Sequence, residues 1–187
     1  MKLEEKEELS LFIIENALQK HPDIFVSCSF GKDSMVLASL ALQANRDVKF
    51  IGIDTGYEFP ETLDYAEKMI NDLNMNFEWV RPDEADIKKI DEFYGEEFEK
   101  EGQMKCCAMK KPAIEKILNR FNAWITGVRR DETEGRKNTK LIEQGKITKI
   151  NPLAFWTFED IWNYIKYNDI EIHPLYAHGY KSLGCKP

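Results

Sequence analysis

The strongest constraint on the fold is an alternation of short β-prone apolar runs with helical segments along most of the chain. The apolar runs occupy residues 24–26, 48–53, 76–80 and 123–126. Helical spacing marks the segments around them, at residues 4–20, 35–44, 61–73, 112–121 and within 152–167. Strands that alternate with helices in this way form a parallel sheet with helices on both faces. The pattern predicts an α/β fold with an open, mostly parallel sheet, in a single domain spanning residues 1–187.

Some finer expectations follow from local patterns. Leu9, Phe12, Ile13 and Ala17 recur at helical spacing, so they should form the buried stripe of the first helix. The charge-rich segment 83–105 and the polar segment 131–146 have weak periodicity. We expect a surface excursion in the first segment and a mobile loop in the second.

Charge and hydropathy exclude several classes of protein. Hydrophobic residues make up 43% and charged residues 32% of the chain, which is typical of a soluble globular protein. The formal net charge of −7 gives no indication of nucleic-acid binding. No apolar run approaches the roughly 20 residues that span a bilayer. Because the first residues are acidic and polar, unlike a targeting sequence, we expect a cytoplasmic location without membrane contact.

The loop after the first expected strand has the composition of an anion site. It reads Ser27-Cys28-Ser29-Phe30-Gly31-Lys32-Asp33-Ser34 and leads into a helix. Gly31 allows close backbone approach to an anion, and the following helix directs its N-terminal amide groups and positive dipole end there. The serine hydroxyls add donors, and Lys32 adds a mobile charge suited to polyphosphate. The loop is not a Walker loop, because the second glycine and its spacer are absent.

Two further segments end or follow strands. Residues 54–60 come after the second strand, and ligands of open α/β sheets bind beyond the carboxyl ends of strands, so both loops should face one site. Arg129 and Arg130 follow the fourth strand, and planar guanidinium groups bind phosphate and sulfate in a bidentate manner.

The four cysteines suit several roles. In a reducing compartment, Cys28, Cys106, Cys107 and Cys185 are expected to be metal ligands, catalytic thiols or buried apolar residues and not disulfides. A disulfide between adjacent Cys106 and Cys107 would strain the backbone severely.

Several motifs, in order, resemble one family. The loop Ser27-x-Ser29-x-Gly31-Lys32-Asp33-Ser34 resembles the PP-loop of the adenine nucleotide α-hydrolase superfamily, whose fold is Rossmann-like. Four later stretches resemble one family within this superfamily, the 3′-phosphoadenylylsulfate (PAPS) and adenylylsulfate (APS) reductases. They are Asp54-Thr55-Gly56-Tyr57-Glu58-Phe59-Pro60, Trp124-x-Thr126-Gly127-x-Arg129-Arg130-Asp131, Asn151-Pro152-Leu153, and His173-Pro174-Leu175-Tyr176 followed by Gly179-Tyr180-x-Ser182-x-Gly184-Cys185.

The resemblance implies a nucleotide across the carboxyl edge of the sheet. The first loop would hold phosphate, the second would lie along the nucleotide, and the arginines would clamp the far phosphate or sulfate. The implied nucleotide-binding residues are Ser27, Ser29, Phe30, Gly31, Lys32, Asp33, Ser34, Asp54, Thr55, Gly56, Tyr57, Phe59, Gly127, Arg129, Arg130 and Arg136.

The cysteines also match a family signature in part. Cys106-Cys107 with the late Gly184-Cys185 resembles the iron–sulfur signature of APS reductases, which pairs a tandem Cys-Cys with a late Cys-x-x-Cys around a [4Fe–4S] cluster. Three of those four ligands are present, namely Cys106, Cys107 and Cys185. Zinc is a second metal that thiolates would hold. Cys28 matches no ligand position and is expected to be a small loop residue.

Three functions remain open. The first is a reductase-family enzyme acting on a sulfonucleotide; the family's catalytic cysteine lies in a C-terminal Glu-Cys-Gly-like motif that this sequence lacks, so we expect no reduction by this chain alone. The second, favoured by Lys32-Asp33, is an ATP pyrophosphatase that adenylates an acceptor with Mg²⁺. The third is a non-catalytic nucleotide-binding subunit. The partners implied are an adenine nucleotide (ATP, APS or PAPS), with thioredoxin, a partner subunit or a second copy of the chain as further candidates.

Overall fold

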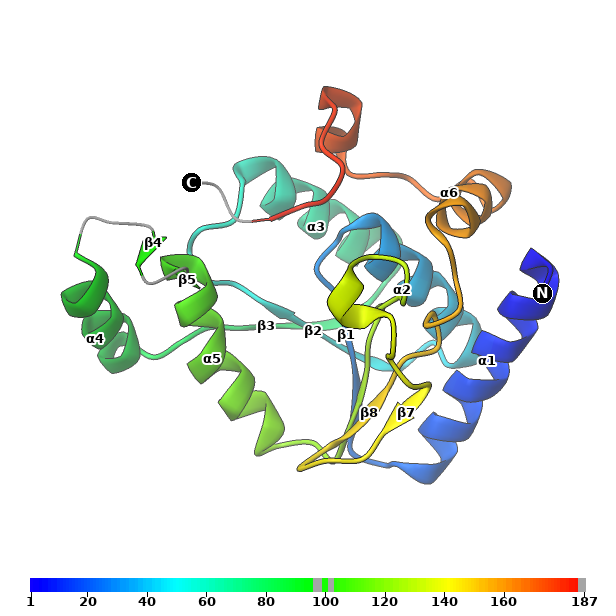
Figure 1. Ribbon diagram of the computed structural model, residues 1–187, viewed down its shortest axis with the longest axis horizontal. Coiled ribbons are helices and arrows are strands. Elements are labelled where there is room, and N and C mark those ends of the chain that lie inside the picture. Colours follow the sequence, from blue (N-terminus) through cyan, green and yellow to red (C-terminus); the bar gives the residue numbers. More distant parts are fainter. Residues whose placement is uncertain (96–98, 101–102, 185–187) are drawn as a thin grey trace.

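A six-stranded sheet forms the centre of the computed structural model, which describes residues 1–95, 99–100 and 103–184 (Figure 1). The strand order is β3-β2-β1-β6-β8-β7. These strands are β1 (Ile24–Ser27), β2 (Lys49–Ile53), β3 (Asn76–Val80), β6 (Ala123–Ile125), β7 (Ile142–Glu143) and β8 (Thr148–Ile150). All neighbours pair in parallel except β7, which is antiparallel to β8. The predicted α/β class with an open, mostly parallel sheet is confirmed.

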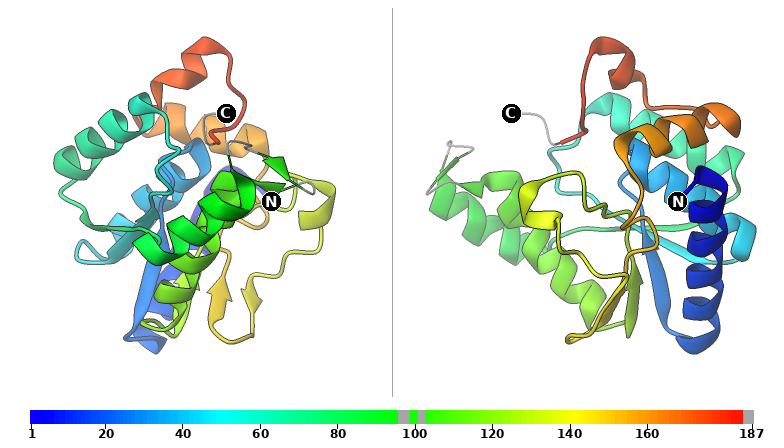
Figure 2. Two further views of the ribbon diagram at one scale, coloured as in Figure 1. Left: turned by 90° about the vertical axis from the view of Figure 1, so that its left-hand side faces the viewer. Right: turned by 45° about the vertical axis from the view of Figure 1, so that its right-hand side comes forward.

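Helices cover both faces of the sheet. Figure 2 shows α1, α2 and α6 on one side and α4 and α5 on the other. The helices are α1 (Leu3–Lys20), α2 (Lys32–Ala44), α3 (Pro60–Asp72), α4 (Glu84–Tyr94), α5 (Lys105–Leu118) and α6 (Phe158–Tyr167). Shorter elements are the hairpin of β4 (Glu99–Lys100) and β5 (Gln103–Met104) and the 3₁₀ turns η1 (Glu134–Arg136) and η2 (Pro174–His178).

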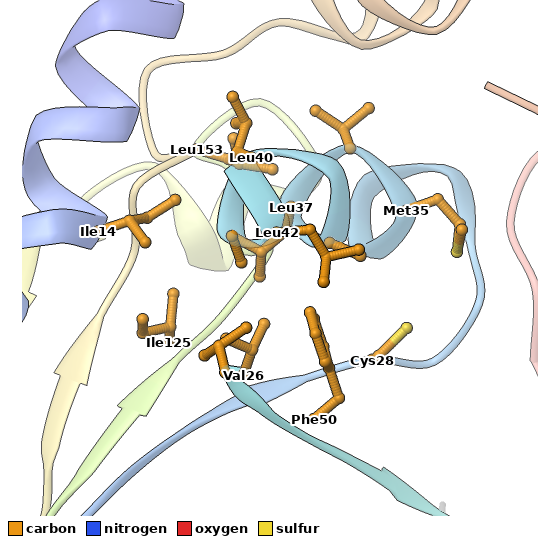
Figure 3. Packing of buried hydrophobic residues seen from close by; sticks show 14 of the residues in the cluster. Ile14, Val26, Cys28, Met35, Leu37, Leu40, Leu42, Phe50, Ile125 and Leu153 are labelled. Atoms are coloured by element: carbon orange, nitrogen blue, oxygen red, sulfur yellow. The ribbon is translucent and has the colours of Figure 1, made fainter. Parts of the chain in front are cut away.

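Each face of the sheet has its own apolar core. On one face, α2 packs over the central strands, and Leu37 and Leu40 lie above Val26, Phe50 and Ile125 (Figure 3). On the other face, a smaller core joins Phe25 and Ile51 of the strands to α5. Burial on both faces explains why the strands are continuous apolar runs instead of alternating ones.

Several elements differ from the sequence-based expectations. The segment 83–105 contains α4, and the expected mobile loop at 131–146 contains η1 and the edge strand β7. The helix expected to begin at Pro112 begins at Lys105, so the proline lies inside α5. Proline lacks an N–H and usually ends a helix, which is why it looked like a first-turn residue.

The first helix buries only part of the expected stripe, namely Ala17, and also buries residues outside that stripe. Phe12 is 63% exposed, whereas Lys6, Ser10, Ile14 and Ala17 are buried. The cause lies far along the chain: Lys6 pairs with Asp160, and the Ser10 hydroxyl donates to the Pro152 carbonyl oxygen at 2.9 Å. These long-range polar contacts set the rotation of the helix.

The order of the strands creates a switch point at the carboxyl edge. From β1 the chain moves outward to β2 and β3, then returns to the other side of β1 as β6. The loops after β1 and β6 therefore diverge, and ligands of open α/β sheets bind in such a crevice. In the part of the chain that the structure describes, no helix is long and apolar enough to cross a membrane.

Gly127 lets the two loops at the switch point approach closely. A Cβ atom placed on it would lie 3.3 Å from the Asp33 carbonyl oxygen, a backbone atom held in the first turn of α2. We predict that Gly127→Ala lowers the free energy of unfolding by about 1–3 kcal/mol, because neither backbone can move aside cheaply. Denaturant unfolding measures the change.

The control for this substitution is Gly135→Ala, because a Cβ at Gly135 meets nothing within 4 Å. That variant should stay within about 0.5 kcal/mol of the original protein. Equal unfolding free energies for the two variants would contradict the close approach at Gly127.

Candidate functional site

The turn from β1 into α2, which we call the anion loop (residues 27–34), is held by an aromatic anchor. Phe30 adopts a left-handed backbone with φ of 58°, a conformation that costs a residue with a side chain about 1–3 kcal/mol. Its ring is fully buried and lies 5.2 Å from the Phe77 ring and 5.7 Å from the Trp79 ring, between centroids. The Phe30 side chain, predicted among the nucleotide-binding groups, is a core residue, and only its backbone belongs to the loop.

The serine hydroxyls shape the anion loop from within. The Ser34 hydroxyl donates to the Gly31 carbonyl oxygen at 2.9 Å and accepts from the Ser29 N–H at 3.3 Å. The Ser27 hydroxyl donates to the Ile125 carbonyl oxygen at 3.3 Å, which ties β1 to β6. Among the described residues, the N–H groups of Gly31 and Asp33 have no hydrogen-bond acceptor. Unpaired N–H groups at a helix N-terminus are suited to an anion.

Arg129 has a structural position. Its side chain is 3% exposed, and Nε donates to Asp33 Oδ1 at 2.6 Å while Nη1 donates to Asp131. The backbone N–H of Arg129 donates to Glu132 at 2.8 Å. This arginine, predicted as part of an oxyanion clamp, joins the β6 loop to the first turn of α2 and is not among the residues that line the cavity.

The other two predicted clamp residues differ from each other. Arg130 donates from Nε to the Thr139 carbonyl oxygen at 2.7 Å, and its guanidinium carbon lies 4.2 Å from the centre of the Phe155 ring. Arg136 pairs with Glu132 at 2.6 Å, keeps 45% of its side chain exposed and lines the cavity described below. Of the three arginines, Arg136 is therefore the one placed to reach a bound molecule.

The second predicted loop turns on Asp54 and Thr55. Asp54 Oδ1 accepts from the Gly56 N–H at 2.8 Å, and Oδ2 accepts from Arg81 Nε at 2.8 Å. The Thr55 hydroxyl donates to Glu58 at 3.1 Å. Gly56 has φ of 80°, a conformation that favours glycine. These residues form the turn, while Glu58 is the residue from it that lines the cavity.

The aromatic residues of that loop lie beside other elements. The Tyr57 ring lies 6.0 Å from Lys105 Nζ, and the Phe59 ring packs edge-on against Tyr180 at 5.9 Å between centroids. Neither is among the residues that line the cavity.

Residues 173–184, which we call the C-terminal segment, fold back over the anion loop. His173 is 1% exposed; its Nδ1 accepts from the Leu175 N–H at 3.1 Å, and its Nε2 lies 3.0 Å from the Thr62 hydroxyl. Burial lowers the pKa of His173, so the ring is neutral, with Nε2–H donating to Thr62. This histidine anchors the segment and does not face the cavity.

The C-terminal segment encloses Lys32. Lys32 is 7% exposed, its Nζ donates to the Lys181 carbonyl oxygen at 3.3 Å, and the same Nζ lies 3.1 Å from Asp33 Oδ2. The ammonium is held by a segment more than a hundred residues later and is not mobile, while Lys32 also lines the cavity described below, so its role in binding a nucleotide stays a prediction. Nothing in the local sequence around Lys32 signals that contact.

A cavity of about 560 Å³ opens between these parts. That volume lies within the roughly 300–1,000 Å³ of small-molecule sites. Its polar end is the anion loop, and its apolar side is formed by the sheet and α5, including Ile51, Ile53, Trp79, Trp124 and Ile114. Some lining residues were not predicted as site residues: Glu58, Thr62, Lys110, Tyr176, Ser182, Leu183 and Gly184. Several of them lie in the stretches that resemble the reductase family, and that resemblance was the signal that could have identified them.

The cysteines fall into two groups. Burial raises the pKa of the Cys28 thiol to about 11, so this residue is an inert loop thiol. Cys106 and Cys107 occupy the first turn of α5, where Cys106 is buried and Cys107 is exposed. Cys185 lies outside the described residues, and within them no three His, Cys, Asp or Glu side chains group closely enough to hold a metal.

Comparison with known proteins identifies the family. Residues 23–187 match the family model described as phosphoadenosine phosphosulfate reductase domain. An adenosine 5′-phosphosulfate reductase of Staphylococcus haemolyticus is 34% identical over 181 residues, covering 94% of this chain and 74% of that protein. Adenosine 5′-phosphosulfate reductase 1 of Bacillus subtilis is 32% identical over 166 residues, covering 86% and 71%.

A solved structure gives the same answer for the fold. The phosphate complex of phosphoadenylyl-sulfate (PAPS) reductase from Candida auris superposes with a TM-score of 0.77 at 24% identity, covering 99% of this chain and 96% of that one. The match of the family model covers the sheet, the anion loop and the C-terminal segment, and the chain belongs to the phosphoadenosine phosphosulfate reductase domain family.

Proposed function

We propose that the cavity binds the nucleotide of an adenine sulfonucleotide, and that the chain takes part in the reduction of its sulfate. The observation that carries this proposal is the pairing of unoccupied amide donors in the anion loop with a cavity of nucleotide size. The phosphate would accept from the Gly31 and Asp33 N–H groups, and the adenine would lie against the apolar side of the cavity. The names of the curated relatives favour APS over PAPS.

The reduction requires a thiolate. A thiolate sulfur attacks the sulfate sulfur, the S–O bond to the phosphate breaks, and AMP leaves with the electron pair. A second thiol then attacks the S-sulfo adduct, so that sulfite is released as the two thiols become a disulfide. The chain would contribute binding and charge stabilisation, with Arg136 placed toward the sulfo group.

Arg136→Gln should weaken APS binding about tenfold and AMP binding little, because the guanidinium would contact the sulfo end. Titration calorimetry with the two nucleotides measures this. The control is Lys137→Gln, the neighbouring cation, whose side chain is 63% exposed and pairs with Glu134. A proportional loss for AMP and APS would contradict the assignment of Arg136.

We further propose that a partner subunit supplies the attacking thiolate, with thioredoxin as the reductant. Cys28 is buried with a raised pKa, and Cys106 is buried in a helix. A thiol that is not ionised is a poor nucleophile at neutral pH. The described part of the chain therefore offers Cys107 as its one exposed thiol, which the metal proposal below assigns to a ligand.

The purified 187-residue chain should bind APS without steady sulfite release when it is supplied with thioredoxin and a reducing system. Sulfite is measured over many turnovers, with the Bacillus subtilis relative assayed in parallel as the positive control. Steady release by this chain would overturn the proposal of a partner's thiolate and would assign the attack to one of its own cysteines.

The second candidate function is ATP-dependent adenylation with Mg²⁺, for which Lys32 and Asp33 are the favourable residues. Both are engaged, Lys32 with Lys181 and Asp33 with Arg129, which weakens this candidate. Release of pyrophosphate from ATP would support it. Nucleotide binding with neither product, even beside a partner carrying a thiol, would support the non-catalytic subunit.

We also propose that Cys106, Cys107 and Cys185 hold a [4Fe–4S] cluster. Lys110 lies one helical turn after Cys106, and it lines the same cavity as Gly184, the residue before Cys185. Thiolates suit iron, and nearby lysines offset the negative charge of a cluster. When bound, the cluster would supply a charged group beside the nucleotide site, while Lys110 would orient the sulfonucleotide.

Protein purified without oxygen should be brown and contain iron, and Cys106→Ser or Cys107→Ser should lose the colour. Cys28→Ala is the matched control and should keep it, because Cys28 lies in the anion loop. Absorption spectra and elemental analysis provide the readout. Zinc found in place of iron would show that the cysteines hold zinc and would overturn the cluster. Colourless protein that lacks both metals after reconstitution would rule out any metal centre.

A further inference from the structure

The first amide of α2 is already occupied by a phenol. The Tyr176 hydroxyl accepts from the Lys32 N–H at 2.9 Å. The same oxygen would lie 3.4 Å from a Cβ placed on Gly31, so it is in van der Waals contact with the loop. A phosphate oxygen that accepted from the Lys32 N–H would need the position that this hydroxyl holds.

The cation of the loop is engaged as well. Lys32 Nζ contacts the Lys181 carbonyl oxygen and the Asp33 carboxylate, and lies 5.6 Å from the centre of the Phe158 ring and 5.8 Å from that of Tyr176. Lys32 lines the cavity, but an outer phosphate that approached this ammonium would compete with the Lys181 carbonyl oxygen and the Asp33 carboxylate. The amide and the ammonium that would hold a pyrophosphate group are thus both contacted by one segment.

That segment is firmly seated. His173 and Leu175 are buried, and the Tyr176 ring packs edge-on against Trp162 at 5.6 Å between centroids. Burial and the nearby Asp33 raise the pKa of Tyr176, so the phenol is neutral at physiological pH. Displacing it would break these contacts together.

We propose that Tyr176 is a specificity-determining residue, which excludes the outer phosphates of ATP from the anion loop and leaves room for a nucleotide with a single phosphate in its chain. This inference rests on the proposed nucleotide site. It explains how a loop with the composition of a triphosphate site would serve a sulfonucleotide. The N–H groups of Gly31 and Asp33 stay available to one phosphate, while the N–H group of Lys32 is occupied by Tyr176.

The test compares the affinities of AMP, APS and ATP with Mg²⁺ by calorimetry. Tyr176→Ala should raise the affinity for ATP relative to AMP about tenfold, since it frees the Lys32 amide and removes the ring beside the Lys32 ammonium. Tyr176→Phe removes the hydroxyl and keeps the ring, so it should give a smaller rise and guards against misfolding of the alanine variant. Tyr167→Phe, at a tyrosine that is 85% exposed, is the matched control and should change nothing.

The outcomes separate this inference from the proposed function. APS binding with an unchanged ATP-to-AMP ratio in both Tyr176 variants overturns the role of Tyr176 and leaves the proposed function standing. A selective loss of ATP affinity would make Tyr176 a ligand contact and would also overturn it. If the original protein binds neither AMP nor APS and the variants gain ATP binding, the proposed sulfonucleotide function is overturned. The exclusion of ATP by Tyr176 then still stands. Absence of nucleotide binding in every protein overturns both.

Discussion

The buried ion pair between Asp33 and Arg129 joins the two loops on which the site depends. Asp33 stands in the first turn of α2 and Arg129 follows β6, so their 2.6 Å contact spans the switch point of the sheet. The guanidinium is almost fully buried, and loss of Asp33 would leave it with Asp131 as its remaining carboxylate, while loss of Arg129 would leave Asp33 with Lys32. Gly127 permits the approach by lacking a side chain. The ion pair and the close approach at Gly127 therefore both hold the loop after β6 against the first turn of α2.

The sheet could be predicted because its information is local. Runs such as Ile24–Val26 and Phe50–Ile53 are apolar on both faces, and the intervening helical periods leave parallel pairing as the consistent arrangement. The edge strand β7 and the helix α4 were missed because short or highly charged elements carry weak periodicity. The exposed Phe12 shows the same limit, since Asp160 and Pro152 determine the orientation of α1 from a distance of more than a hundred residues.

The candidate site was predictable in position and less so in the roles of its side chains. Composition located the anion loop, and the rule for carboxyl ends of strands located its neighbours. The same composition could not tell that Phe30 points into the core or that Arg129 is held by Asp33. Those roles arise from tertiary contacts, and a sequence motif does not reveal which residues its side chains contact. The C-terminal segment was identified as a family motif, but its contacts with Lys32 were not predicted, because they join residues more than a hundred positions apart.

The cover over Lys32 also has a consequence for the order in which the molecule is built. Domains fold from the N-terminal side during synthesis, at about 5–20 residues per second. The anion loop leaves the ribosome early, whereas Tyr176 emerges 144 residues after Lys32. Until Tyr176 and Lys181 have been made, the nascent anion loop therefore lacks the contacts that engage the Lys32 amide and ammonium. Under the exclusion proposed for Tyr176, selectivity against ATP would arise only once the C-terminal segment has folded back over the loop.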